Sequence, residues 1–97
     1  MDIIKKYFQG QIVFLDSYTY NENTVTIRIC KVEPEEILGE LYYTGIRDYE
    51  DDQYDQEEGN YLESILEIVD EGLTLFLETD IREISFIYKT FEFRKKN

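Results

Sequence analysis

The sequence predicts an α+β domain that is mostly β, with a short N-terminal helix and an antiparallel sheet or small sandwich of five to six strands. Ninety-seven residues is the length of one domain. Nine Tyr, six Phe and a 42% apolar share provide the material for a core, which acidic disordered chains lack. Several short segments alternate β-branched or aromatic residues with polar ones, as strands do. We therefore expect residues 1–97 to form a single domain.

The N-terminal segment "DIIKKYFQG" predicts the helix. Asp2 is a suitable N-cap, and Gly10 is well placed to end the helix because glycine tolerates the left-handed conformation. The segment also places four apolar residues on one helical face, namely Ile3, Ile4, Tyr7 and Phe8.

The next two segments, "QIVFLDSYTY" and "TVTIRICKV", predict a β-hairpin that turns at "NEN". In the second segment Val25, Ile27 and Ile29 alternate with polar residues, so we expect the Val25 side to face the core. Pro34 has no N–H to donate to a ladder, and strand pairing should therefore stop near Val32.

The segment "EEILGELYYTGI" fits either a helical turn or a strand with a bulge at Gly39, and its aromatic residues favour the strand. "YLESILEIVDEGLTLFLET" fits a helix over residues 61–69 or a hairpin that turns at "DEG". The alternation of leucines after this turn favours the hairpin. The last segment, "REISFIYKTFEF", predicts one long strand with Ile84, Phe86 and Tyr88 on the same side.

The charge of the chain is concentrated in its middle. The net charge is −12, and residues 32–80 contain one basic and seventeen acidic residues. Within them "DYEDDQYDQEEGN", Asp48 to Asn60, holds seven carboxylates and no cation, which predicts an acidic loop at residues 48–60. Such a field repels nucleic-acid phosphates and anionic lipid and attracts basic proteins. We therefore expect no direct nucleic-acid partner and no membrane partner.

The sequence also indicates a cytoplasmic protein. Its apolar runs are shorter than the roughly 18 residues that a membrane span needs, and the N-terminus meets polar residues too early for a signal peptide. Cys30 is the only cysteine, which excludes an internal disulfide and suits a reducing compartment. Its expected role is that of a small buried residue.

The residue types argue against catalysis and against a regular metal site. Without histidine, the chain lacks the Ser-His and Cys-His pairs of nucleophilic enzymes and the usual zinc ligands, so we expect no enzyme, no catalytic residue and no cofactor. The acidic stretch also fails the register of the common calcium loop. Counted from Asp48, its sixth position is Gln53 and its twelfth is Gly59, where that loop has glycine and glutamate. No metal residue is therefore assigned, although weak, irregular calcium binding by the stretch stays open.

Two explanations of the acidic stretch remain. It is either a solvated loop that aids solubility or a surface that binds a cationic partner. Arg47 is the only cation between Val32 and Asp80, so the acids repel one another unless a partner neutralises them. Tyrosines among the acids add rigid contact area. The predicted partner-binding residues are Tyr49, Glu50, Asp51, Asp52, Tyr54, Asp55, Glu57 and Glu58, extended by Glu63, Glu67, Asp70 and Glu71 if the next segment displays them on the same side.

The segment "FLDSYTYNENTVTIRI", an Asp-Ser pair followed by a hairpin of alternating β-formers, resembles the small acidic β-rich immunity proteins carried beside bacterial toxins. Acidic phage inhibitors of nucleic-acid-guided defence complexes are similar in size and charge. The resemblance covers residues 12–29 and the overall charge, and it assigns no role to an individual residue. It implies inhibition of a basic partner, such as a toxin or a nucleic-acid-binding protein, by carboxylates that mimic nucleic-acid charge. The alternative is a small structural or assembly domain that pairs through its strands, its acidic loop only solvated.

Overall fold

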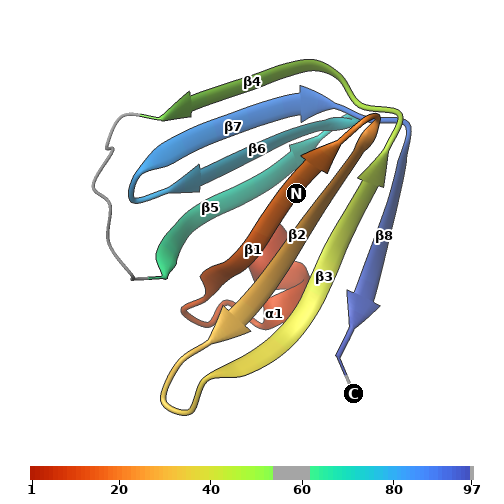
Figure 1. Cartoon of the computed structure of the whole chain (residues 1–97). Coiled ribbons are helices and arrows are strands. Elements are labelled where there is room, and N and C mark those ends of the chain that lie inside the picture. Colours follow the sequence, from red (N-terminus) through yellow and green to blue (C-terminus); the bar gives the residue numbers. More distant parts are fainter. Residues whose placement is uncertain (54–61, 97) are drawn as a thin grey trace.

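The computed structural model describes residues 1–53 and 62–96, which form one short helix and eight strands (Figure 1). None of the described helices is long and apolar enough to cross a bilayer. The elements are α1 (Ile3–Phe8), β1 (Phe14–Asn21), β2 (Thr24–Lys31), β3 (Glu36–Thr44), β4 (Arg47–Gln53), β5 (Glu63–Glu71), β6 (Thr74–Thr79), β7 (Arg82–Ile87) and β8 (Thr90–Lys95).

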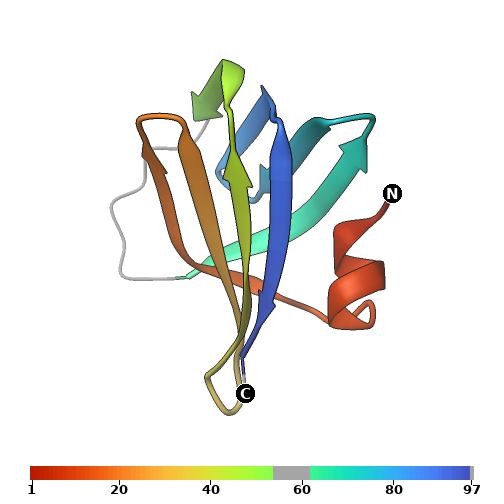
Figure 2. The ribbon, with the colours of Figure 1, turned by 90° about the vertical axis from the view of Figure 1, so that its right-hand side faces the viewer.

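The strands pair antiparallel in one sheet with the order β4-β7-β6-β5-β1-β2-β3-β8. The sheet folds over on itself, so that two layers face each other (Figures 1 and 2). We refer to β4, β7, β6 and β5 as layer 1 and to β1, β2, β3 and β8 as layer 2. The layers are joined by a short pairing in which Phe14 lies opposite Ser64 and Leu15 opposite Glu63.

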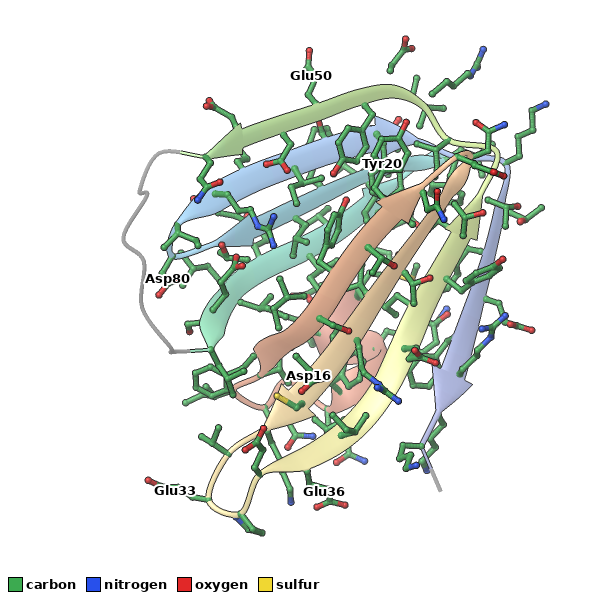
Figure 3. All side chains as sticks on the ribbon, viewed as in Figure 1. Asp16, Tyr20, Glu33, Glu36, Glu50 and Asp80 are labelled. Carbon is green, nitrogen blue, oxygen red and sulfur yellow. The ribbon has the colours of Figure 1, made fainter. Side chains whose placement is uncertain are left out.

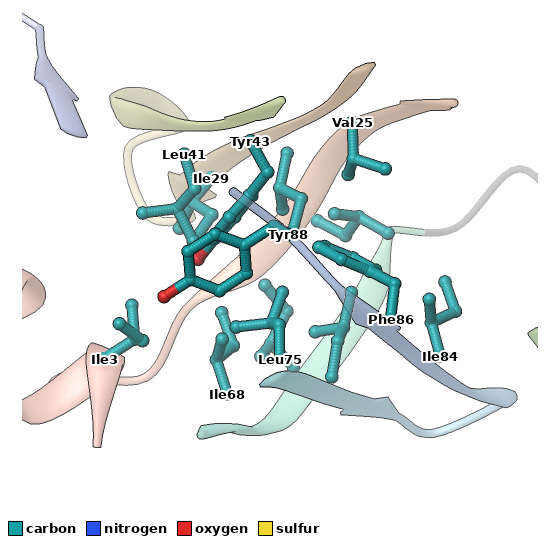
Figure 4. Close-up of a cluster of buried hydrophobic side chains, with 14 of the residues drawn as sticks. Ile3, Val25, Ile29, Leu41, Tyr43, Ile68, Leu75, Ile84, Phe86 and Tyr88 are labelled. Carbon is teal, nitrogen blue, oxygen red and sulfur yellow. The ribbon is translucent and has the colours of Figure 1, made fainter. Parts of the chain in front are cut away.

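The core lies between the layers and contains large aromatic side chains from both (Figure 4). The ring of Tyr43 in layer 2 is 5.3 Å from that of Phe86 in layer 1 and 4.9 Å from that of Tyr88. The Tyr88 hydroxyl donates a hydrogen bond to the Asp70 carboxylate. Burial raises the pKa of Tyr43, whose fully buried hydroxyl has no hydrogen-bond partner in the described part of the chain. These aromatic contacts tie the two layers into one packed unit.

The helix forms as the sequence predicts. The Asp2 side chain caps it by accepting a hydrogen bond from the Lys5 amide at 3.1 Å, and the chain leaves it through left-handed Gln9 and Gly10. Ile3 and Phe8 are buried, while Tyr7 packs against Phe93 of β8 with ring centroids 4.6 Å apart. The Asp2 backbone also bridges to β5. The helix therefore spans from one layer to the other and covers the core where β5 and β8 are unpaired with each other.

Both hairpins are confirmed, and so is the Val25 core face, since Val25, Ile27 and Ile29 are fully buried. The segment with Gly39 is a strand, and its pairing with β2 shifts register beside that glycine, as a bulge requires. Residues 63–69 belong to β5, which confirms the hairpin and excludes a helix there.

The expectation of five to six strands is wrong, for two reasons. First, residues 48–53 were expected in a loop but form most of β4, because they pair with β7 at the sheet edge. Second, the expected long strand at the C-terminus is divided into β7 and β8, which pair in different layers. Ile84, Phe86 and Tyr88 all face the core, so the alternation continues up to the point where the chain changes layer. Periodicity alone does not show that point.

The chain crosses between the layers twice at one corner, from β3 to β4 and from β7 to β8 (Figure 1). The Lys89 amide of the second crossing donates to the Thr44 carbonyl of the first at 2.8 Å. Gly45 has a φ of +72°, and a Cβ there would lie 2.7 Å from the Lys89 side chain. Only glycine satisfies both the left-handed conformation and this close approach.

Candidate acidic binding face

The structure separates the acids of β4 between two sides of the sheet. Glu50 and Asp52 lie opposite Ser85 and Glu83 of β7 and face away from the core, as Figure 3 shows for Glu50. Asp51 alternates with them and lies on the core side, opposite Ile84. The other predicted binding residues, Tyr54, Asp55, Glu57 and Glu58, lie outside the described residues.

Tyr49 is used in packing. Its ring stacks on that of Tyr20 with centroids 3.9 Å apart, and its hydroxyl lies 2.9 Å from the hydroxyl of Tyr18. Burial raises the pKa of both Tyr18 and Tyr49. These contacts join β4 of layer 1 to β1 of layer 2 on the side away from α1. Tyr49 was predicted as a partner-binding residue, and because its ring packs on Tyr20 we leave it out of the proposed face.

Arg82 compensates two of the acids. Its guanidinium donates two hydrogen bonds to the Glu63 carboxylate at 3.0 and 2.9 Å, lies 3.7 Å from an Asp51 carboxylate oxygen and sits 5.1 Å from the Tyr18 ring. Thr79 also donates to Glu63, at 2.8 Å. Asp51 and Glu63 are therefore part of an internal polar network, which the count of cations between residues 32 and 80 did not anticipate.

A row of four acids runs across the outer side of layer 1. Asp52 of β4 lies directly opposite Glu83 of β7, which lies opposite Glu78 of β6, which lies opposite Glu67 of β5. We call these four residues the acidic row. Within the described part of the chain, none of the four carboxylates has an ion pair or a hydrogen bond. Like charges directly opposite each other across a ladder destabilise it by roughly 0.2–1 kcal/mol per pair.

A shallow hollow of about 230 Å³ adjoins the acidic row. One of the side chains that line it is Phe76, which is 43% exposed although it sits on an interior strand. The hollow is lined by Glu67, Val69, Glu71, Phe76, Leu77, Glu78 and Glu83. Carboxylates around an exposed aromatic ring suit an arginine or lysine side chain, which pairs with the acids and packs on the ring.

We call the acidic row together with Glu50, Glu71 and Phe76 the acidic face. Sequence analysis found Glu50 and Asp52, and it named Glu67 and Glu71 as conditional extensions. The other two conditional residues, Glu63 and Asp70, are bonded to Arg82 and Tyr88 instead. Glu78 and Glu83 were not predicted, because both lie outside the acidic segment of residues 48–60 and join the row only through the strand register.

Comparison with known proteins supports the fold. No protein-family model and no curated protein matches the chain. A similar fold occurs in the crystal structure of an uncharacterized protein from Neisseria gonorrhoeae, with a TM-score of 0.60 and 17% sequence identity. The alignment covers 86% of this chain and 90% of that chain. At this identity the likeness concerns the arrangement of the strands alone.

Proposed function

We propose that this protein is an acidic binding protein that inhibits a basic protein partner by covering its cationic surface with the acidic face. The observation that carries the proposal is the acidic row. Four carboxylates lie opposite one another, and none of them pairs with a cation among residues 1–53 and 62–96. This arrangement has a cost in the isolated fold that a cationic partner removes.

Protection of the sheet edge does not explain the row. Charged residues on an edge strand prevent pairing with other chains, and this accounts for Glu50 and Asp52 on β4. Glu83 and Glu78 lie on β7 and β6, which are paired on both sides and present no edge, whereas Glu67 lies on β5 beyond its short pairing with β1 at Glu63 and Ser64. Solubility does not account for the row either, because it requires charge but not like charges in direct opposition.

The spacing of the row supports inhibition by mimicry of a nucleic-acid backbone. Neighbouring strands are about 4.8 Å apart, so four successive strand positions span roughly 14 Å. Phosphates follow one another about every 3.4 Å along the axis of one DNA strand, so the row offers comparable charge on a comparable scale. The sheet also fixes the backbone positions from which the four side chains project, which reduces the entropy cost of association. A basic toxin or nucleic-acid-binding protein whose phosphate groove is occupied in this way loses access to its substrate.

Pairing through the sheet edges is the alternative, as in a small assembly domain. β8 and β4 each have one unpaired side in the described sheet. Both are rich in charged residues, which disfavours edge pairing. The alternative therefore has weaker support than binding by the acidic face.

The proposal is tested with two variants that lose the same charge. One changes the acidic row through Asp52→Asn, Glu67→Gln, Glu78→Gln and Glu83→Gln. The control changes four exposed acids associated with layer 2 through Glu22→Gln, Glu33→Gln, Glu36→Gln and Glu92→Gln. The partner is captured from bacterial lysates with the wild type, purified, and titrated against all three proteins by calorimetry.

We expect the row variant to lose about tenfold or more in affinity, at least 1.4 kcal/mol, and the control to lose much less. Binding by the wild type should also weaken at about 0.5 M salt, where charges are strongly screened. Equal losses in the two variants would mean that only net charge matters, and unchanged affinity of the row variant would exclude the acidic face.

A further inference from the structure

The fully buried thiol of Cys30 lies near two carboxylates in layer 2, away from the acidic face. One donor atom from each of Asp16, Cys30 and Glu35 lies within 4.8 Å of the other two. Cys30 is fully buried, Asp16 is half-buried and Glu35 is exposed. Figure 3 shows the Asp16 side chain next to a sulfur atom at the outer side of the sheet.

The three residues come from three segments that local irregularities bring together. Asp16 is the extra residue where the pairing of β1 with β2 shifts register, between Leu15 and Ser17. A second shift, in the pairing of β2 with β3, follows Ile29 and so falls next to Cys30. Glu35 comes from the turn that leads into β3. Bulges of this kind re-aim side chains and are frequent beside functional sites.

Among the described residues, no cation forms an ion pair with the carboxylates of this cluster. The nearby Lys31 pairs with Glu36 and Arg28 pairs with Glu40, and neither contacts Asp16 or Glu35. In the described part of the chain the Cys30 thiol makes no hydrogen bond, although its sulfur lies within 4.8 Å of a carboxylate oxygen of both Asp16 and Glu35. Burial, Asp16 and Glu35 together raise the pKa of Cys30. A bound cation would pair with the carboxylates and turn the thiol into a thiolate ligand.

We propose that Asp16, Cys30 and Glu35 form a binding site for a thiophilic divalent cation of the Zn²⁺ class. Zn²⁺ accepts thiolate and carboxylate ligands together in a four-coordinate site, whereas Ca²⁺ and Mg²⁺ are bound through oxygen. Donors on a tetrahedral zinc lie about 3.5 Å apart, a distance that follows from bond lengths of about 2.0–2.3 Å. On binding, the exposed Glu35 side chain moves so that the donor atoms, now within 4.8 Å of one another, reach this shorter distance. Water fills the fourth position. Binding would fasten the turn before β3 onto β1 and β2 and release the thiol proton.

Cobalt provides the test, because Co²⁺ occupies zinc sites and a thiolate ligand gives it a near-ultraviolet charge-transfer absorption. Metal-free protein is titrated with Co²⁺ and then with Zn²⁺ as a competitor. We expect the absorption to saturate at one Co²⁺ per chain, to disappear when Zn²⁺ is added and to be absent in Cys30→Ser. Glu35→Gln should weaken Co²⁺ binding by about tenfold or more, as loss of groups at a metal site commonly does.

Glu33→Gln is the matched control, because it removes an exposed acid from the same turn, and it should bind Co²⁺ like the wild type. A thermal shift with Zn²⁺ gives a second readout, expected in the wild type and the control and absent in Glu35→Gln. Since Glu35 is exposed, this variant keeps the fold even if Cys30→Ser unfolds. Absence of a saturable absorption in the wild type would overturn the proposal. Equal Co²⁺ affinity of the wild type, Glu35→Gln and Asp16→Asn would also overturn it.

Discussion

In layer 2, opposite charges face each other across neighbouring strands: Arg28 of β2 lies opposite Glu40 of β3, and Glu40 lies opposite Arg94 of β8. Layer 1 also has a row of charged residues that lie opposite one another on its outer side, but all four residues of this row are acids. The two layers share one core and one sheet, so the fold itself does not demand either arrangement. The opposite charges of layer 2 stabilise the pairing of its strands. The like charges of the acidic row in layer 1 do not, and they need a different explanation.

Reversing the charge of the acidic row should have the largest effect, and this effect is on binding affinity. Glu78→Lys combined with Glu83→Lys places two cations where the partner presents its own, and we expect affinity to fall about 100-fold, or roughly 2.7 kcal/mol. Calorimetry with the purified partner measures the change. Glu22→Lys combined with Glu33→Lys is the control, and a similar fall in that variant would contradict the prediction.

Arg82 allows a second test, because it is the cation that balances Asp51 and Glu63 in layer 1. Arg82→Gln leaves the mostly buried Glu63 carboxylate without its two charged hydrogen bonds, and we expect a loss of about 1–3 kcal/mol in the free energy of unfolding. Urea denaturation provides the measurement. A loss below 0.5 kcal/mol, roughly the limit for neutral surface changes, would show that the network contributes little.

The free energy of unfolding of the isolated protein should respond in opposite directions to charge reversal in the acidic row of layer 1 and in the row of opposite charges in layer 2. Glu78→Lys replaces two like-charge pairs with opposite ones and should raise the free energy of unfolding by roughly 0.4–2 kcal/mol, which is about 0.2–1 kcal/mol for each pair. Glu40→Lys does the reverse in layer 2 and should lower it by a similar amount. Thermal or urea denaturation of the two variants checks both signs. If Glu78→Lys is destabilising, the row is not a site of uncompensated repulsion.

The cluster around Cys30 in layer 2 also lacks such charge pairing, and the prediction drawn from it has the smallest expected effect. The pKa of Cys30 is raised in the folded state, so the folded thiol keeps its proton at a pH where the unfolded thiol loses it. The resulting stability is complete below the unfolded pKa of about 8.5 and is lost as pH rises through the folded pKa. Urea denaturation in metal-free buffer between about pH 7 and 9.5 should show this decline in the wild type. In Cys30→Ala the slope should be shallower, and an unchanged slope would assign the decline to other groups.

The sequence was sufficient where structure depends on neighbours along the chain. Spacing within about ten residues is enough to predict four features: the Asp2 cap, the apolar face of α1, the two hairpin turns and the buried side of β2. β4 escaped prediction because its acids have low strand propensity and only their pairing with β7 makes them a strand. The division of β7 from β8 escaped because core-facing alternation runs through the corner.

Two of the four residues of the acidic row could be predicted from the sequence, because they lie in or near one acidic segment of the chain. Asp52 belongs to the acidic segment of residues 48–60 and Glu67 follows it closely, whereas Glu78 and Glu83 lie farther along the chain, outside that segment. Their alignment depends on the register of three ladders. The cluster of Asp16, Cys30 and Glu35 is set by register shifts, which local periodicity does not reveal.

The pairing of β4 with β7 has a consequence for how the protein is made. A ribosome releases β4 early, but its only partner in the described sheet is β7, which follows after both strands of the β5–β6 hairpin have been synthesised. Until Arg82–Ile87 emerge, the acids of β4 have no ladder to align them with those of β5 and β6. The complete acidic row therefore comes into existence only after β7 has been synthesised, and a nascent chain interrupted before that point has no such row with which to engage a target.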